Sequence, residues 1–144
     1  MSAESDILAG LFTAWTALAE EFVAGAPDVR ALYIYASSER GMTVANLYVD
    51  QRGSVRHPGR VDGIPGDTAR VSRLQDLLTE DLFDAEDALS AAGIPRPTEY
   101  RILFDPVTRA LDVQLSHDEQ YAADDGRSPI RGVEYWLGDR APTL

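Results

Sequence analysis

The sequence predicts an α+β fold, in which three helices flank an antiparallel sheet of four to five strands within one domain over residues 1–144. Two long segments repeat apolar side chains every three or four residues, the spacing of amphipathic helices. Four or five short segments are rich in aromatic and β-branched residues and are joined by turns, as in hairpins. The expected order is helix, two strands with a possible third, helix, two strands, helix. Consecutive strands set between helices favour an antiparallel sheet.

The first helix is predicted from about Asp6 to Ala24. Ser5 is the expected N-cap, because its hydroxyl can accept a hydrogen bond from a free amide of the first turn. Gly25 and Pro27 should end the helix. Its apolar stripe consists of Leu8, Leu11, Phe12, Trp15, Leu18, Ala19 and Phe22.

Two strands and a short third follow. Ala31–Ala36 and Met42–Val49 read as a hairpin, with a turn over residues 37–41 that contains Ser37, Ser38, Arg40 and Gly41. Gln51–Gly53 predicts a second turn, and Val55 belongs to the possible third strand. The next stretch, residues 58–67, holds three Gly and two Pro and is predicted to be a loop.

The second helix has the clearest boundaries. Asp67 or Thr68 should cap its start, and Gly93 followed by Pro95 should close it. The expected buried stripe is Val71, Leu74, Leu78, Leu82, Ala85 and Leu89.

A second hairpin and a final helix complete the chain. The strands are Glu99–Phe104 and Ala110–Ser116, with a turn at residues 105–108. Leu111, Val113 and Leu115 alternate with polar residues, so one face of this strand should be covered and the other should face water.

A polar loop spans residues 117–127. Ser128 and Pro129 then begin a short helix that ends at Gly138. It carries Ile130, Val133, Tyr135, Trp136 and Leu137. Trp15, Tyr135 and Trp136 are expected to pack in the core or between helix and sheet.

Composition excludes several kinds of chemistry. The chain has 24 Asp and Glu against 13 basic residues, all of them Arg, so the formal net charge is −11, and it contains no Lys and no Cys. Lysine nucleophiles, thiol catalysis, disulfides and thiolate metal sites are therefore excluded. The negative charge argues against nucleic acid as a partner and favours a basic protein.

No apolar run reaches the ~18 residues of a membrane span. Glu4 and Asp6 precede the first apolar stretch, unlike a signal peptide, so we expect a cytoplasmic protein.

The second helix carries the sharpest candidate site. Asp76, Glu80, Asp84 and Asp87 fall within an arc of about 80° opposite the leucine stripe. Such an acidic arc is either a solvated helix face or a docking surface for a basic partner. Phe83 projects at its margin, where it is either an interface anchor or packed beneath a neighbouring loop.

The polar loop holds a second acidic group around Tyr121. Its members are Asp118, Glu119, Asp124 and Asp125. Their spacing does not match a calcium-binding loop, so a partner-facing or solvated loop is favoured over a metal site. Gly59, Gly63 and Gly66 match no phosphate-binding pattern. We expect no cofactor and no metal.

The two histidines, His57 and His117, lack metal-ligand spacing. Both are expected at the surface or at strand ends. A triad cannot be dismissed from sequence, because triads are defined by geometry, and an enzyme that pairs His117 with a neighbouring carboxylate is the third hypothesis. No motif supports it, so the chain is expected not to be an enzyme.

Four segments resemble the YezG-like immunity proteins. They are Ala31–Ala36 and Thr43–Val49 in the first hairpin, Leu111–Glu119 at the closing strand and acidic loop, and Arg131–Gly138 in the terminal helix. The resemblance covers most of the chain in element order. The tail differs: the family often ends in Trp-Glu-Tyr-Lys-Tyr-Leu-Gly, whereas residues 133–138 read Val-Glu-Tyr-Trp-Leu-Gly. The resemblance implies an antitoxin that binds a cognate polymorphic toxin, often a nuclease and in related cases an NAD-degrading toxin, and blocks its active site.

Two binding functions are thus expected before any enzyme. The first is a monomeric immunity protein with a cognate toxin as partner. The alternative is an acidic chaperone for a secreted effector, since small acidic α+β proteins with this element order resemble class I secretion chaperones. Those chaperones usually dimerise through a helix and offer apolar grooves to an extended client.

Overall fold

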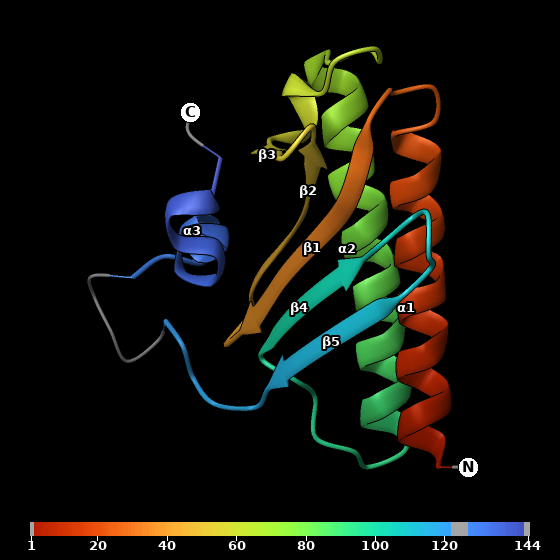
Figure 1. Cartoon of the computed structure of the whole chain (residues 1–144). Coiled ribbons are helices and arrows are strands. Elements are labelled where there is room, and N and C mark those ends of the chain that lie inside the picture. The colour runs from red at the N-terminus through yellow and green to blue at the C-terminus, as the bar shows by residue number, and fades with distance from the viewer. Residues whose placement is uncertain (1, 122–126, 143–144) are drawn as a thin grey trace.

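The structure is a computed structural model that describes residues 2–121 and 127–142 (Figure 1). It confirms the α+β class and the predicted order of elements. The helices and strands are α1 (Ala3–Phe22), β1 (Val29–Glu39), β2 (Met42–Gln51), β3 (Ser54–Arg56), α2 (Thr68–Ala91), β4 (Glu99–Phe104), β5 (Leu111–Ser116) and α3 (Gly132–Leu137). Three 3₁₀ turns add Pro58–Arg60, Pro129–Arg131 and Gly138–Arg140. Within the described ranges, no helix is both long enough and apolar enough to cross a bilayer.

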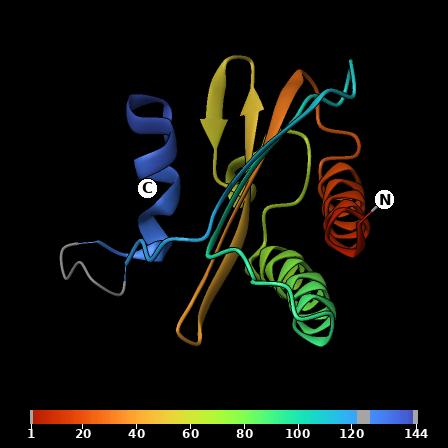
Figure 2. The ribbon, with the colours of Figure 1, turned by 90° about the horizontal axis from the view of Figure 1, so that it is seen from below.

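The sheet lies between two layers of helices. Its strand order is β3-β2-β1-β4-β5, and every neighbouring pair is antiparallel. Figure 2 shows α1 and α2 on one face and α3 on the other. Along β1, Leu32 and Ile34 join the core beneath α1 and α2, whereas Tyr33 and Tyr35 pack with Val133 of α3. Because both faces of β1 are covered, its middle part, residues 31–36, is apolar throughout instead of alternating.

Helix α1 begins three residues earlier than predicted. The N-cap is Ser2, not Ser5: the Ser2 Oγ accepts a hydrogen bond from the Ser5 N–H at 3.1 Å. Glu4 and Asp6 then lie in the first turn, where the helix dipole stabilises negative charge. Trp15 is fully buried, as expected, and its Nε1–H donates to the Leu78 carbonyl of α2 at 2.9 Å.

The first hairpin is longer than predicted. Ser37 and Ser38 were expected in the turn, but they pair with Val44 and Thr43 in the β1–β2 ladder. Only Arg40 and Gly41 form the turn, with φ of 46° and 82°. Two consecutive residues with positive φ suit the twist of antiparallel strands, so sheet pairing overrides the turn preference of serine.

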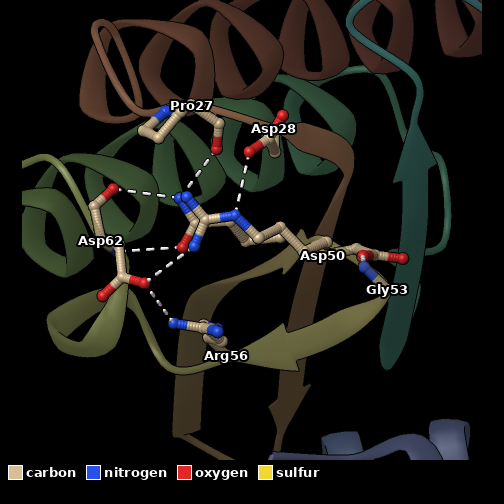
Figure 3. A network of polar contacts seen from close by, with 8 residues as sticks. Pro27, Asp28, Asp50, Gly53, Arg56 and Asp62 are labelled. Atoms are coloured by element: carbon tan, nitrogen blue, oxygen red, sulfur yellow. Dashed lines mark hydrogen bonds and ion pairs between the residues drawn. The ribbon is translucent and has the colours of Figure 1, made fainter.

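A polar network holds the far end of this hairpin (Figure 3). The Gln51 amide Nε2–H donates to the carbonyls of Pro27 and Asp62, at 2.8 and 3.0 Å. Its Oε1 accepts from the Asp62 N–H at 2.9 Å. Arg52 bridges the Asp28 and Asp62 carboxylates at the surface. The network therefore joins the end of β2 to the loops that follow α1 and β3.

Helix α2 follows its prediction closely. Asp67 is the N-cap, Gly93 adopts φ of 72° just beyond the end, and five of the six predicted stripe residues are buried. The sixth, Val71, is half-buried. Glu86 is buried as well, with its carboxylate accepting from the Ser38 Oγ at 2.7 Å.

Two apolar side chains in the C-terminal half are more exposed than predicted. Leu111 is 45% exposed because β5 is the edge strand of the sheet, so the covered face expected for this strand is incomplete. Ile130 precedes α3 in a 3₁₀ turn capped by Ser128 and is 75% exposed. Trp136 instead meets its prediction by packing its ring on Tyr33 and Tyr35 of the sheet.

Candidate partner-binding surface

The four carboxylates predicted on one side of α2 are all exposed. They are Asp76, Glu80, Asp84 and Asp87. The leucine stripe of α2 faces the sheet and α1, which turns the acidic side towards solvent. Within residues 2–121 and 127–142, none of the four forms an ion pair. The charge on this helix face is therefore not neutralised by any ion pair with the described residues.

The pKa of Asp81 reflects repulsion between the carboxylates on this helix. Partial burial raises the pKa of its carboxyl, and the neighbouring charges of Asp84 and Glu80 raise it further. Like charges three or four residues apart on a helix destabilise it by a few tenths of a kcal/mol per pair. The acidic face thus costs some stability to maintain.

We expect Asp81→Asn to stabilise the protein. A raised folded-state pKa means that the ionised carboxyl destabilises the folded state above the unfolded pKa of about 3.9. The free energy of unfolding should therefore rise by about 0.3–0.5 kcal/mol at pH 7, and the gain should vanish below about pH 4. Urea denaturation at pH 7 and pH 3 measures both values. Asp112→Asn on β5 is the control for loss of a charge elsewhere; a destabilised Asp81→Asn protein at pH 7 would contradict the repulsion.

Phe83 lies beside the acidic face and is 47% exposed. The interpretation that it packs beneath a neighbouring loop is therefore wrong. A large aromatic side chain surrounded by carboxylates costs free energy in water, and burial against a partner recovers that cost. Its position suits an anchor at the edge of a charged interface.

The second acidic group is only partly a surface. Asp118 and Glu119 are exposed, and Glu119 forms an ion pair with Arg40 at 2.7 Å. Tyr121 is 5% exposed, so its side chain has almost no surface to offer a partner. Asp124 and Asp125 lie outside the described residues.

Buried carboxylates at the end of the sheet hold this segment in place. The Glu39 carboxylate accepts hydrogen bonds from the N–H groups of Gln120 and Tyr121, at 2.8 and 3.2 Å. The Tyr35 hydroxyl donates to Glu99 at 2.5 Å and contacts the Tyr121 hydroxyl. Burial, followed by the hydrogen bond to Glu99, raises the pKa of Tyr35 far above its usual range. Sequence reasoning missed this cluster; the alternation of Tyr33, Tyr35, Ser37 and Glu39 in one strand was its only signal.

The two acidic groups lie at the same end of the sheet but on opposite faces. Ser38 points to α2, where it bonds Glu86, whereas the adjacent Glu39 points to residues 120 and 121. Neighbouring side chains in a strand project to opposite faces. A partner in contact with both groups would have to reach around the β1–β2 turn. We therefore take the acidic face of α2 with Phe83, called the α2 surface below, as the candidate site.

The histidines do not assemble a catalytic group with the described residues. His117 is exposed and makes no hydrogen bond or ion pair to them. His57 is half-buried, with its ring centroid 5.7 Å from that of Tyr48, and burial and then Arg60 lower its pKa. No group of three or more acidic or histidine side chains in the described ranges is placed to hold a metal. Gly59 and Gly66 have a packing role, since a Cβ on Gly66 would overlap the Gly59 backbone.

Comparison with known proteins adds no assignment: no family model matches the chain, and no curated protein matches it. The resemblance to YezG-like proteins remains an expectation from the sequence. The function is therefore inferred from the charged surface itself.

Proposed function

We propose that this protein is a non-enzymatic immunity protein that binds and inhibits a cognate toxin through the α2 surface. The observation that carries the proposal is the set of four exposed carboxylates with no ion pair inside the described chain, beside a half-exposed phenylalanine. The net charge of −11 acts in the same direction. The fold itself does not select this function.

The α2 surface would act in two steps. Its charge accelerates encounter with a basic active-site cleft, such as that of a nuclease or an NAD-degrading toxin. Phe83 then becomes buried at the contact and slows dissociation, because buried aromatic anchors dominate binding energy. Inhibition follows from covering the cleft, so the chain needs no catalytic residue and no cofactor of its own. In this proposal it acts as a monomer in the cytoplasm of the toxin-producing cell, without binding nucleic acid or membranes.

We expect Glu80→Arg with Asp84→Arg to slow association with the toxin encoded beside its gene. Replacing two carboxylates by guanidinium groups reverses the local field, so the association rate should fall about tenfold at low ionic strength. The loss should shrink above about 0.5 M salt, where the Debye length is only a few ångströms. Stopped-flow mixing at several salt concentrations measures the rate.

The matched control is Glu21→Arg with Asp112→Arg. Both residues are exposed, lie outside the α2 surface and form no ion pair with the described chain, and the net charge changes by the same amount. Equal slowing in both double variants would show that total charge, not the α2 surface, steers the encounter. If the wild-type chain forms no complex with that toxin and fails to protect cells, the immunity function itself is wrong. A stable dimer that binds a secreted effector would support the chaperone alternative.

A further inference from the structure

A separate cleft lies between α3 and strand β2, beside His57 just after β3. Helix α3 covers the face of the sheet opposite α2 (Figure 2). The volume of the cleft is about 620 Å³. Residues that line it include Tyr48, His57, Ile130, Val133, Glu134 and Asp139. The α2 surface contributes nothing to this cleft, so its properties need a separate explanation.

The aromatic side of the cleft is formed by Tyr48 and His57, and it has one polar atom without a partner. Tyr48 is 5% exposed, and its hydroxyl accepts a long hydrogen bond from the Asn46 amide at 3.4 Å. His57 Nε2 is buried and has no hydrogen-bond partner among the residues that the structure describes. Buried polar groups are nearly always paired, so an unpaired ring nitrogen beside this cleft indicates a place for a hydrogen-bond donor.

The opposite side carries negative charge. Glu134 and Asp139 are exposed. Burial is the main reason that the pKa of Tyr48 is raised, and the negative charge of Glu134 raises it further. His57 adds no opposing charge at neutral pH, because burial and Arg60 lower its pKa. Arg131 already pairs with Glu134 at 2.5 Å, whereas Asp139 has no ion pair in the described part of the chain. The cleft can therefore take one additional cation.

The remaining walls are apolar, and together with the rings they select the kind of cation. Val133 and the largely exposed Ile130 form an apolar wall that an alkyl chain can pack against. A guanidinium is planar, stacks on aromatic rings and offers several N–H donors to carboxylates and to a neutral imidazole nitrogen. An ammonium group has neither the flat face nor the fork of donors.

We propose that this cleft receives an arginine side chain from the basic partner. The alkyl stem lies along Ile130 and Val133, the guanidinium meets Tyr48 and His57, and Asp139 and Glu134 neutralise its charge. The inference rests on the proposed function only in that the partner is a basic protein. It places a contact for a basic protein on the face of the sheet opposite the α2 surface, so a single partner that occupies both sites must extend around the edge of the sheet.

The test titrates the full chain with Nα-acetyl-argininamide and follows the ¹⁵N and ring signals by NMR. We expect saturable shifts at the His57 and Tyr48 rings and at the amides of residues 130–139. The corresponding citrulline amide has the same length without the charge and should give no saturable shift; the lysine amide should bind several-fold more weakly. Shifts confined to the α2 surface, or equal shifts with the citrulline amide, would overturn the proposal.

Three variants sharpen the assignment. Glu134→Gln with Asp139→Asn should weaken binding of the arginine amide about tenfold, since two partly exposed charge contacts are lost. Arg131→Gln should strengthen binding several-fold, because it releases Glu134 for the probe. Glu80→Arg with Asp84→Arg should leave probe binding at the cleft unchanged. An unaltered affinity in both cleft variants would overturn the site. A bound probe in a protein that fails to protect cells from the toxin would instead count against the immunity function alone.

Discussion

Gly132→Ala should detach α3 from the sheet. A Cβ at position 132 would overlap the ring of Tyr35, and that ring cannot retreat because its hydroxyl is bonded to Glu99 and Tyr121. Overpacking of a rigid site usually costs 1–3 kcal/mol and occasionally more, so we expect a loss of about 3 kcal/mol. Most of that loss should appear as undocking of α3, since the main core beneath α1 and α2 does not include this helix.

Two measurements follow the loss of α3 packing. Trypsin should cleave after Arg131 about a hundredfold faster, which is the change in open population expected for about 3 kcal/mol. The fluorescence of Trp136 should shift to the red while Trp15 stays buried in the main core. Gly10→Ala in α1 is the matched control: no atom lies within 4 Å of its added Cβ, and its helical backbone suits alanine, so no stability should be lost.

A double-variant cycle gives the decisive outcome. In a Tyr35→Ala background the added methyl group has room, so Gly132→Ala should lose most of its cost there. If the cost is the same in both backgrounds, the overlap with Tyr35 is not its cause. Unchanged trypsin sensitivity of Gly132→Ala would contradict the prediction outright.

Gln51→Ala should destabilise the fold by a similar amount. The side chain is fully buried and satisfies two carbonyls and one amide of the surrounding loops (Figure 3). Truncation leaves these three groups without their partner, at roughly 1 kcal/mol or more each, so we expect a loss of about 3 kcal/mol. Urea denaturation at pH 7 measures it.

Two controls separate the causes of that loss. Gln51→Met keeps most of the volume without the polar atoms, so it should remain nearly as unstable as Gln51→Ala if hydrogen bonds matter most. Asp62→Asn removes the ion pairs with Arg52 and Arg56, whose carboxylate partner is more than half exposed, and should cost less than about 1 kcal/mol. If Asp62→Asn lowers the free energy of unfolding more than Gln51→Ala does, surface ion pairs and not buried hydrogen bonds stabilise this end of the sheet.

Local patterns were sufficient for most of the fold. Helix α2 and strand β4 have the predicted boundaries, because capping residues, glycine and proline act on their immediate neighbours. Apart from the local choice of Ser2 over Ser5 as the N-cap of α1, the main errors occur where distant contacts decide. Ser37 and Ser38 join β1 through pairing with β2, and Ile130 stays exposed although its neighbour Val133 is buried.

The candidate site shows the same division. Helical spacing alone placed the four carboxylates of the α2 surface on one side, opposite the leucines. It could not determine whether Phe83 is covered, because that depends on which loop passes over the helix. Tyr121 lies near its acidic neighbours in sequence, yet it is buried by Tyr35 and Glu99, which are far away along the chain.

The sequence by itself determined the excess of acid, the absence of Lys and Cys, the class of fold and the acidic side of α2. Each of these depends on composition or on a repeat within one element. The tertiary structure alone decided that α3 covers the second face of the sheet, that Glu39 and Glu99 are buried, and that a cleft opens beside His57. These features arise where segments 22 to 103 residues apart come into contact. The periodicity of one helix or strand carries no information about which distant segment will pack against it.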